Sequence, residues 1–263
     1  MAIEVHMFLD RKSRFALLGF WILLLMGSAI ISEGFFACVY AQEPPVMPPP
    51  PPLSPEERAL EKPAPIKKLG AGLVSIGNII VDTAKKEVTV PGRMLRDQTL
   101  EFLATTKRGM KSYESAMELD TNAVSFNLAL IMIGLQKSNA VAPQQHFDAA
   151  PTVGDPVDIW VEWGTGDNVR KLRADELLYD LRTKSVPKLG VWVYTGSTVL
   201  PDGPYLAELD GVLIGFVHDP ASIIENSTGG GLNAYGSIRL NPDIKIAPDT
   251  PIKLTVKALP KQK

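Results

Sequence analysis

The segment Lys111–Leu135 reads KSYESAMELDTNAVSFNLALIMIGL, a short polar stretch followed by an apolar one. At their junction, residues 120–122 offer three side-chain oxygens that can accept hydrogen bonds from the free N–H groups of a first helical turn. Gly134 suits the last turn, where a left-handed backbone is favourable. Between them the apolar side chains are Phe126, Leu128, Leu130, Ile131, Met132 and Ile133. A helix that is apolar nearly all round is typically buried, so the segment predicts a central helix covered by the rest of the fold.

Short stretches with the composition or periodicity of β-strands lie on both sides of this helix. They are residues 79–81, 88–90, 100–104, 157–163, 190–194, 205–209, 212–217 and 252–258. The first two flank a polar loop and predict a hairpin, and residues 157–163 alternate apolar with polar side chains as a two-faced strand does. Residues 173–182 have leucines at helical spacing and predict a short helix. The sequence therefore predicts a single α+β domain over residues 66–263, mainly antiparallel, with one buried central helix.

Residues 1–41 have the layout of an export signal: a positive segment at 11–14, an apolar run at 15–31 and a small-residue cleavage site at 39–41. The apolar run is long for a signal peptide and short for a membrane span. The segment is predicted either to be cleaved or to remain as a membrane anchor, with lipid attachment at Cys38 as a third alternative. In each case the protein is predicted to be secreted, periplasmic, or anchored to the cytoplasmic membrane from outside.

Residues 42–65 contain ten of the 22 prolines of the chain, including the unbroken run at 48–52. Such a composition favours the extended polyproline II conformation, which acts as a stiff spacer. The segment is therefore predicted to be a disordered, proline-rich linker that holds the following domain away from a membrane or wall. An alternative is that it serves as a ligand for the groove of a partner protein.

The charge and the cysteine content exclude several classes of function. The net charge is −2, and removing residues 1–41 leaves it unchanged because three basic and three acidic side chains leave together. Without a basic excess, nucleic acid is not predicted as a partner. Cys38 is the only cysteine, so cleavage leaves no disulfide, no thiol nucleophile and no cysteine-ligated cluster. No cofactor is predicted.

Four further patterns are interpreted as structural. The Gly164-Thr165-Gly166 motif lacks the third glycine and the following helix of a dinucleotide loop, so it predicts a hairpin turn. The glycines at 229–231 lack the Lys-Ser/Thr pair of a phosphate loop and predict a loop tip. The two histidines beyond residue 41, His146 and His218, are too few for a zinc site, and His146 is interpreted as a loop residue without a role. The aspartates within 155–167 lack the spacing of a calcium loop.

Several short motifs occur in the order of a known family. They are Gly77-Asn78-Ile79, Val88-Thr89-Val90-Pro91-Gly92, Leu100-Glu101-Phe102-Leu103, Lys111-Ser112-Tyr113-Glu114-Ser115, the end of the apolar helix, Gly154-Asp155-Pro156-Val157, Trp192-Val193-Tyr194-Thr195-Gly196-Ser197 and Asp210-Gly211. Together they resemble the YdjY domain family, common among exported bacterial proteins, over roughly residues 77–220. That family has no established activity, so the resemblance implies no reaction. Its Gly-Lys-x-His-Glu-Ser pattern is matched at Lys111, Glu114 and Ser115, whereas Met110 and Tyr113 replace the glycine and the histidine.

The polar residues ahead of the apolar helix are the strongest candidates for a ligand site. With the turn after residues 190–194 and a strand-end histidine, they are predicted to border a cleft formed by Lys111, Glu114, Ser115, Thr195, Ser197 and His218. The alternative is that Glu114 and Ser115 satisfy backbone groups in a strand-to-helix turn. No residue is predicted to be catalytic or to bind a metal.

The sequence therefore predicts an exported envelope protein that acts by binding a small ligand or another envelope protein, displayed on its proline-rich stalk. Membrane contact is predicted only through a possible N-terminal anchor. A second hypothesis is a hydrolase in which His218 activates Ser115 or Ser197. A third is an envelope scaffold whose strand edges contact other proteins.

Overall fold

The structure is a computed structural model that describes residues 62–201, 204–229 and 236–260. The predicted export segment and most of the predicted linker lie outside the described residues, as do the glycines at 230 and 231. The contacts of the domain include residues ahead of position 66: the Ala64 N–H donates to Ser125 Oγ at 2.9 Å, and Asn122 Nδ2 donates to Lys62 O at 2.8 Å.

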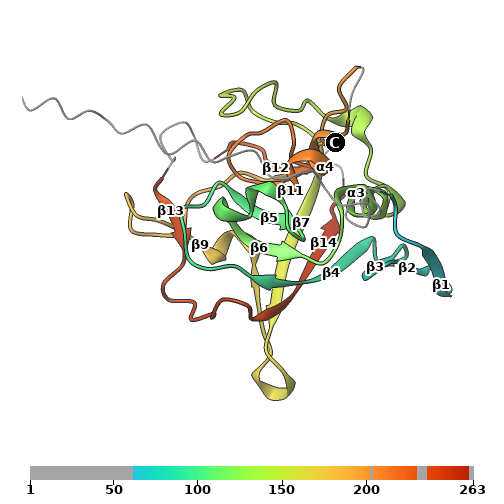
Figure 1. Ribbon diagram of the computed structural model, residues 1–263, viewed down its shortest axis with the longest axis horizontal. Coiled ribbons are helices and arrows are strands. Elements are labelled where there is room, and N and C mark those ends of the chain that lie inside the picture. Colours follow the sequence, from blue (N-terminus) through green and yellow to red (C-terminus); the bar gives the residue numbers. More distant parts are fainter. Residues whose placement is uncertain (1–61, 202–203, 230–235, 261–263) are drawn as a thin grey trace, which may run out of the picture. The chain divides into compact units, whose positions relative to one another are not determined.

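Eight strands close into a barrel (Figure 1). In order around the barrel they are β4 (Glu87–Met94), β14 (Pro251–Ala258), β7 (Asp155–Trp163), β10 (Trp192–Tyr194), β12 (Ile224–Asn226), β11 (Val212–Gly215), β5 (Phe102–Thr106) and β6 (Ser115–Leu119), and β6 pairs with β4 again. The β11–β12 and β5–β6 pairs are parallel and the other six are antiparallel.

The remaining elements surround this barrel. They are β1 (Ile66–Gly70), β2 (Leu73–Ile76) and β3 (Ile79–Asp82), which extend the sheet from β4; β8 (Arg170–Arg173), which pairs with β7; β9 (Leu178–Asp180) and β13 (Ile238–Leu240), which pair with each other; the α-helices α3 (Ala123–Met132) and α4 (Leu206–Asp210); and the short 3₁₀ turns η2 (Met110–Glu114), η3 (Lys137–Asn139), η4 (Gly166–Asn168) and η5 (Ala174–Leu177). No helix among the described residues combines the length and the apolar character needed to cross a membrane.

The predicted α+β domain with a buried central helix is wrong, because the described chain is mostly β and closes into a barrel. The helix itself forms close to where the sequence predicts it, with Asn122 Oδ1 accepting from the Ser125 N–H at 2.8 Å and Gly134 at a φ of 96°. It lies beside the barrel against β3 and α4 rather than at its centre (Figure 1). Phe126 is fully buried, whereas Ile131 is 50% exposed. The apolar circumference of the helix therefore exceeds the surface that covers it.

Two local predictions also fail. Residues 205–209 are predicted as a strand, but residues 206–209 belong to α4, and Tyr205 before it forms an isolated bridge with Val199; the helix is followed by Gly211 in the left-handed conformation. Residues 173–182, predicted as a helix, form η5 and then β9, where Leu178 is buried and pairs with Leu240 of β13. The predicted hairpins are confirmed: β3 pairs with β4, and Gly164 and Gly166 take positive φ in the turn between β7 and β8.

One wall of the barrel, formed by β4, β14 and β7 with β3 alongside, has a buried inner face and a wet outer face. Leu254 of β14 lies opposite Val90 and Val161 in the barrel interior, and all three are buried. The outward residues carry charges and hydroxyls, as where Lys253 Nζ lies 3.9 Å from Glu162 Oε1. We call this the open wall; it follows the period of two that its sequence predicts.

The other wall, formed by β10, β12, β11, β5 and β6, is buried on both faces. Loop segments lie over its outside: the Val217 N–H donates to Glu101 O at 3.2 Å, and the Phe147 N–H donates to His218 O at 2.9 Å. Phe102 of β5 belongs to a small apolar cluster with Val212 and Ala221, separate from the barrel core. We call this the covered wall.

The barrel closes where β4 passes β6 at Gly92, opposite Leu119. A β-carbon at Gly92 would lie 2.3 Å from Glu118 O, so only glycine fits at this approach of the two backbones. The Val88–Gly92 motif is therefore a structural requirement of the barrel.

Candidate functional site

Three of the six predicted site residues have buried hydroxyls that bond to the backbone. Ser115 Oγ donates to Lys111 O at 2.8 Å, Thr195 Oγ1 to Ser222 O at 2.8 Å, and Ser197 Oγ to Pro220 O at 3.3 Å. All three residues are 0% exposed. These side chains hold the turns around the covered wall in place, and their hydroxyls are not open to a ligand.

His218 is buried in the same way, at 2% exposed. Its Nδ1 lies 2.8 Å from Asp148 O and its Nε2 lies 2.9 Å from Asn226 O, so the ring ties the 141–153 loop to β12. A hydrolase needs a serine hydroxyl hydrogen-bonded to its general base. Among the described hydrogen bonds, those of His218 go to Thr152 and to the two carbonyls, and neither Ser115 nor Ser197 is a partner.

Lys111 and Glu114, the two other predicted residues, form an ion pair within η2. Lys111 Nζ lies 2.7 Å from Glu114 Oε1 and 5.8 Å from the centroid of the Phe102 ring. Burial on its own would lower the pKa of Lys111, but the hydrogen bond and the charge of Glu114 raise it. The pKa of Glu114 is raised chiefly by burial, against the hydrogen bond from Lys111, and the charge of Glu101 adds to the rise.

A third group, His146, enters from the loop that precedes β7. Its Nε2 lies 3.0 Å from Glu101 Oε2, and its Nδ1 lies 4.0 Å from Asp219 Oδ2. The ring stacks on Phe147 at 4.1 Å between centroids and lies 6.5 Å from the Phe102 ring. The contact with Glu101 raises the pKa of His146, and the charge of Asp219 adds to the rise, whereas burial and Lys111 oppose it.

The carboxylates beside His146 are nearly buried: Glu101 is 2% exposed and Asp219 is 7% exposed. Glu101 Oε2 has no well-directed hydrogen bond from the described residues, and the His146 ring lies beside it at 3.0 Å. The N–H of Asp219 donates to Glu225 Oε1 at 3.0 Å. Glu225 is fully buried, and burial raises its pKa well above the ordinary value.

We call Glu101, Lys111, Glu114, His146 and Asp219 the outer cluster. The chain brings them together from four segments: the start of β5, η2, the 141–153 loop and the loop between β11 and β12. The cluster opens to solvent at His146, whose side chain is 35% exposed. Three carboxylates therefore surround one ammonium and one imidazole at the surface of the covered wall.

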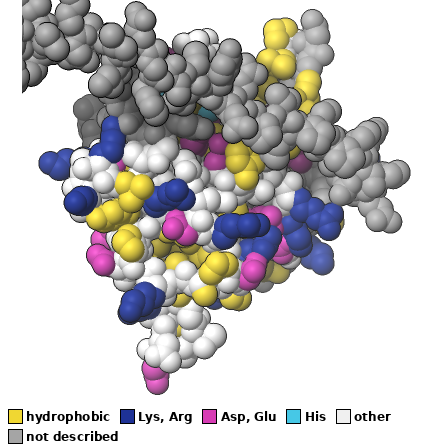
Figure 2. All heavy atoms as spheres, turned by 60° about the vertical axis from the view of Figure 1, so that its left-hand side comes forward, with side chains coloured by type: hydrophobic (Ala, Val, Ile, Leu, Met, Phe, Trp, Pro, Cys, Tyr) yellow, Lys and Arg dark blue, Asp and Glu magenta, His cyan; other side chains and the backbone are white. Residues whose placement is uncertain are grey.

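On the face in Figure 2, lysine and arginine side chains lie interspersed with aspartate and glutamate side chains, and several lysine and arginine side chains lie close together at the right. The described residues include no group of three or more histidine, cysteine, aspartate or glutamate side chains placed to hold a metal ion.

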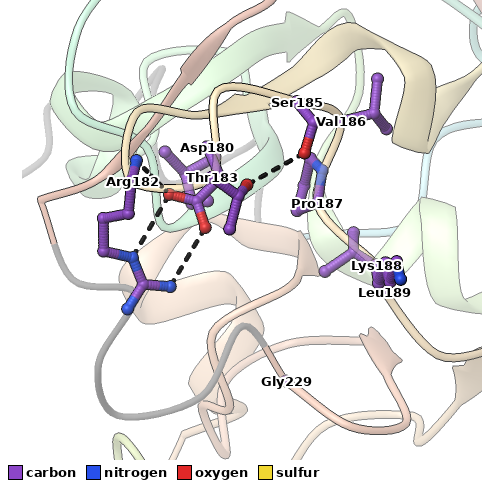
Figure 3. Close-up of a pocket in the computed structure, with 10 residues that line it drawn as sticks. Asp180, Arg182, Thr183, Ser185, Val186, Pro187, Lys188, Leu189 and Gly229 are labelled. Carbon is purple, nitrogen blue, oxygen red and sulfur yellow. Dashed lines mark hydrogen bonds and ion pairs between the residues drawn. The ribbon is translucent and has the colours of Figure 1, made fainter.

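A separate cavity of about 450 Å³ lies beside the turn that follows β9 (Figure 3). Arg182 and Asp180 line it and are paired with each other, with Arg182 Nη2 3.1 Å from Asp180 Oδ2. The hydrogen bond from Arg182 lowers the pKa of Asp180. The charges of Asp180 and Arg182 are therefore matched with each other, and Lys188 adds a further positive charge to the lining.

A sequence model of the YdjY domain matches residues 79–257. The chain belongs to the YdjY domain family. A comparison with curated proteins gives no match, and a comparison with solved structures gives none either. The matched range runs from β3 to β14 and contains the whole outer cluster. Tyr113, where the resemblance described above leads one to expect a histidine, is 51% exposed beside Lys111, and the imidazole of the outer cluster comes from His146.

Sequence reasoning found Lys111 and Glu114 and missed Glu101, His146 and Asp219. The missed residues, Glu101, His146 and Asp219, lie 10, 32 and 105 positions from the nearer of the two, in segments that only the barrel closure brings together. One signal was available in the sequence. Glu101 directly precedes an apolar strand, and Asp219 directly follows His218 in the loop after a second apolar strand. Charged residues in the loops at strand ends are common in functional sites.

Proposed function

We propose that this domain binds a polar ligand through the outer cluster and acts by binding rather than by catalysis. The observation that supports this most directly is the convergence of two nearly buried carboxylates, Glu101 and Asp219, on one partly exposed imidazole, beside the nearly buried Glu114 that is paired with Lys111. Removing charges from water costs several kcal/mol per ion, in order of magnitude, and neighbouring like charges raise that cost. Such arrangements are concentrated at functional sites.

The chemistry of the cluster favours binding. Its five residues include no hydroxyl or thiol that could serve as a nucleophile, and both ring nitrogens of His146 face carboxylates. The cluster thus offers hydrogen-bond acceptors, two cationic groups and the Phe102 ring, a combination that orients a polar ligand.

We infer in addition that the domain works outside the cytoplasm. The basic segment, the apolar run and the small-residue site within residues 1–41 support export, and the prolines of residues 42–65 support a spacer. The ligand is then a small molecule or a segment of an envelope protein that reaches the outer cluster.

The test is a nuclear magnetic resonance screen of the full chain against small polar molecules, with amines, carboxylates, phosphates and neutral polyols equally represented. Ligands are expected to shift the backbone amides of Glu101, Glu114 and His146. Glu114→Gln should weaken binding by about tenfold or more, because it removes one charge of a nearly buried pair.

Glu118→Gln is the matched control. Glu118 is equally buried, at 7% exposed, and also ion-paired, to Arg93 at 3.2 Å, but it lies on β6 outside the outer cluster. It should leave ligand affinity unchanged. Equal losses in the two variants, or ligands that shift only other parts of the chain, would reject the proposal.

A further inference from the structure

We propose that the outer cluster recognises a primary ammonium group, which takes the position between Glu101 and Asp219 that the His146 ring occupies in the structure. This inference rests on the proposed binding function and names the chemical class of its ligand. It follows from the geometry around His146, from the balance of charge in the cluster and from the aromatic rings beside it.

The geometry around His146 is that of a cation site. The ring places one nitrogen 3.0 Å from Glu101 Oε2 and the other 4.0 Å from Asp219 Oδ2, so two carboxylates face it from different loops. Glu101 Oε2 is buried and lacks a well-directed hydrogen bond from the described residues, which an ammonium N–H would supply. An ammonium carries three N–H donors on one atom, whereas an imidazolium carries two that point in opposite directions. A compact ammonium therefore suits the two carboxylates better than the ring does.

The charge balance of the cluster also favours a cation. Lys111 is held by Glu114 at 2.7 Å, whereas the side chain that lies beside both Glu101 and Asp219 is His146; Asp219 Oδ1 also accepts from the Ala221 N–H at 2.8 Å. Repulsion between carboxylates is visible at two positions: the charge of Glu101 contributes to the raised pKa of Glu114, and that of Asp219 contributes to the raised pKa of Asp210. An added positive charge relieves this repulsion, whereas an anion increases it.

Aromatic rings provide the remaining contacts. The Phe102 ring lies 5.8 Å from Lys111 Nζ and 6.5 Å from the centroid of His146, so it already faces the two cationic groups of the cluster. Phe147 stacks on His146 at an interplanar angle of 8°. Cations are attracted to such ring faces, and the rings offer an apolar surface to the methylene groups next to an ammonium.

The exchange of His146 for a ligand makes binding depend on pH. The imidazolium competes with the ligand for Glu101 and Asp219, and the neutral ring competes much less. The charged groups that face His146 are Glu101, Asp219 and Lys111, and their combined effect raises its pKa. As the pH rises through that pKa, the imidazolium loses its charge and ammonium binding strengthens.

The test titrates the full chain with n-butylammonium chloride and, as matched probes of the same chain length, n-butanol and sodium butyrate. The ring signals of His146 and the amide of Glu101 report binding. Butylammonium is expected to bind about tenfold or more tightly than butanol, with butyrate weakest, because the charge of the cluster discriminates among them. Its affinity should rise about tenfold between about pH 6 and about pH 8.5, across the histidine titration.

Two variants separate recognition from folding. His146→Gln replaces an exposed loop side chain and should abolish the rise of butylammonium affinity with pH, because it removes the competing imidazolium. Glu101→Gln should weaken butylammonium binding about tenfold or more, and Glu118→Gln should not. If the affinity for butylammonium still rises with pH in His146→Gln, the inference is overturned, even where Glu101→Gln fails to fold.

The outcomes also distinguish this inference from the binding function. If the chain binds butyrate preferentially and Glu114→Gln loses that binding, the ligand class is not an ammonium. The outer cluster then remains a ligand site. If none of the three probes shifts the signals of His146 or Glu101, the assignment of an ammonium ligand is overturned. The proposed binding function is overturned as well only if the broader panel of polar molecules also yields no ligand at the outer cluster.

Discussion

The open and covered walls of the barrel are built from the same kind of strand but are surrounded differently. On the open wall, residues such as Val161 and Glu162 alternate between the barrel core and solvent. On the covered wall, every residue of β5 and β6 is buried; η2 packs against both of these strands, and α4 packs against β11 and η2. The open wall therefore resembles a simple two-faced sheet, whereas the covered wall has a second buried layer outside the barrel.

The difference explains where the outer cluster lies. A charge on the outer face of the open wall is hydrated, and the pKa of Asp82 is lowered there, chiefly by a backbone hydrogen bond from Lys85. Beneath the loops of the covered wall, burial raises the pKa of Glu114, Asp210 and Glu225. The covering loops thus turn ordinary surface carboxylates into desolvated ones, which is the condition for a selective polar site.

The largest expected effect concerns two aromatic residues that both lie outside the barrel core. Phe102→Ala on the covered wall should lower the free energy of unfolding by about 3–5 kcal/mol, because the ring is fully buried. Trp160→Ala on the open wall should cost about 1–2 kcal/mol, since that ring is partly exposed and contacts Lys171 and Arg173 at its faces. Urea unfolding of the full chain measures both values.

Equal losses in these two variants would show that the loops over the covered wall do not exclude water. Circular dichroism of each variant in the absence of urea serves as the control, because the comparison requires that both retain the barrel.

The second prediction concerns Glu225, the most deeply buried carboxyl group of the covered wall. Burial raises its pKa, so the folded state holds the proton above the pH at which the unfolded state, with an ordinary pKa of about 4.3, releases it. Stability from this group is therefore greatest at low pH and falls as the pH rises. Glu225→Gln keeps an acceptor for the Asp219 N–H and removes the titration. The melting temperature of the variant, relative to wild type, should rise between about pH 5 and about pH 8.

A relative melting temperature that falls over the same range would mean that Glu225 is ionised and favourably paired in the folded state. Glu118→Gln provides a comparison at a carboxylate that is ion-paired to Arg93 and lies away from the outer cluster.

The sequence predicts the four strands of the open wall, and on the covered wall it predicts β5, β10 and β11 but neither β6 nor β12. Alternation of apolar and polar residues identifies a strand with one wet face, as at Val157–Trp163 and at Ile252–Ala258. Once both faces are buried the alternation disappears, as at Ser115–Leu119, where every residue is buried and no strand is predicted. The parallel pairs of β5 with β6 and β11 with β12, on which barrel closure depends, leave no local signal.

The two histidines show the same limit at the level of the site. His218, at a strand end beside an aspartate, was predicted to be the functional one, and its ring is bound to backbone carbonyls. His146, in a polar loop, was interpreted as having no role, and its ring lies between Glu101 and Asp219. The neighbouring sequence indicates whether a histidine lies in a loop or at a strand end. The side chains that contact its ring come from distant segments, which only the closed barrel brings together.

The smallest expected effect is at Asp82, where the same carboxyl-to-amide exchange is made on the open wall. The Lys85 N–H donates to Asp82 Oδ1 at 2.9 Å, and Lys85 Nζ lies 3.2 Å from Oδ2. Because the folded pKa is lowered, the stability that Asp82 contributes is present at neutral pH and is lost as the pH falls through that pKa. Asp82→Asn should therefore lower the melting temperature slightly at neutral pH and not at all in acid. Measured beside Glu225→Gln, its relative melting temperature should fall with rising pH while that of Glu225→Gln rises. If the relative melting temperatures of the two variants changed with pH in the same direction, desolvation by the covering loops would not be the cause of the difference between the two walls.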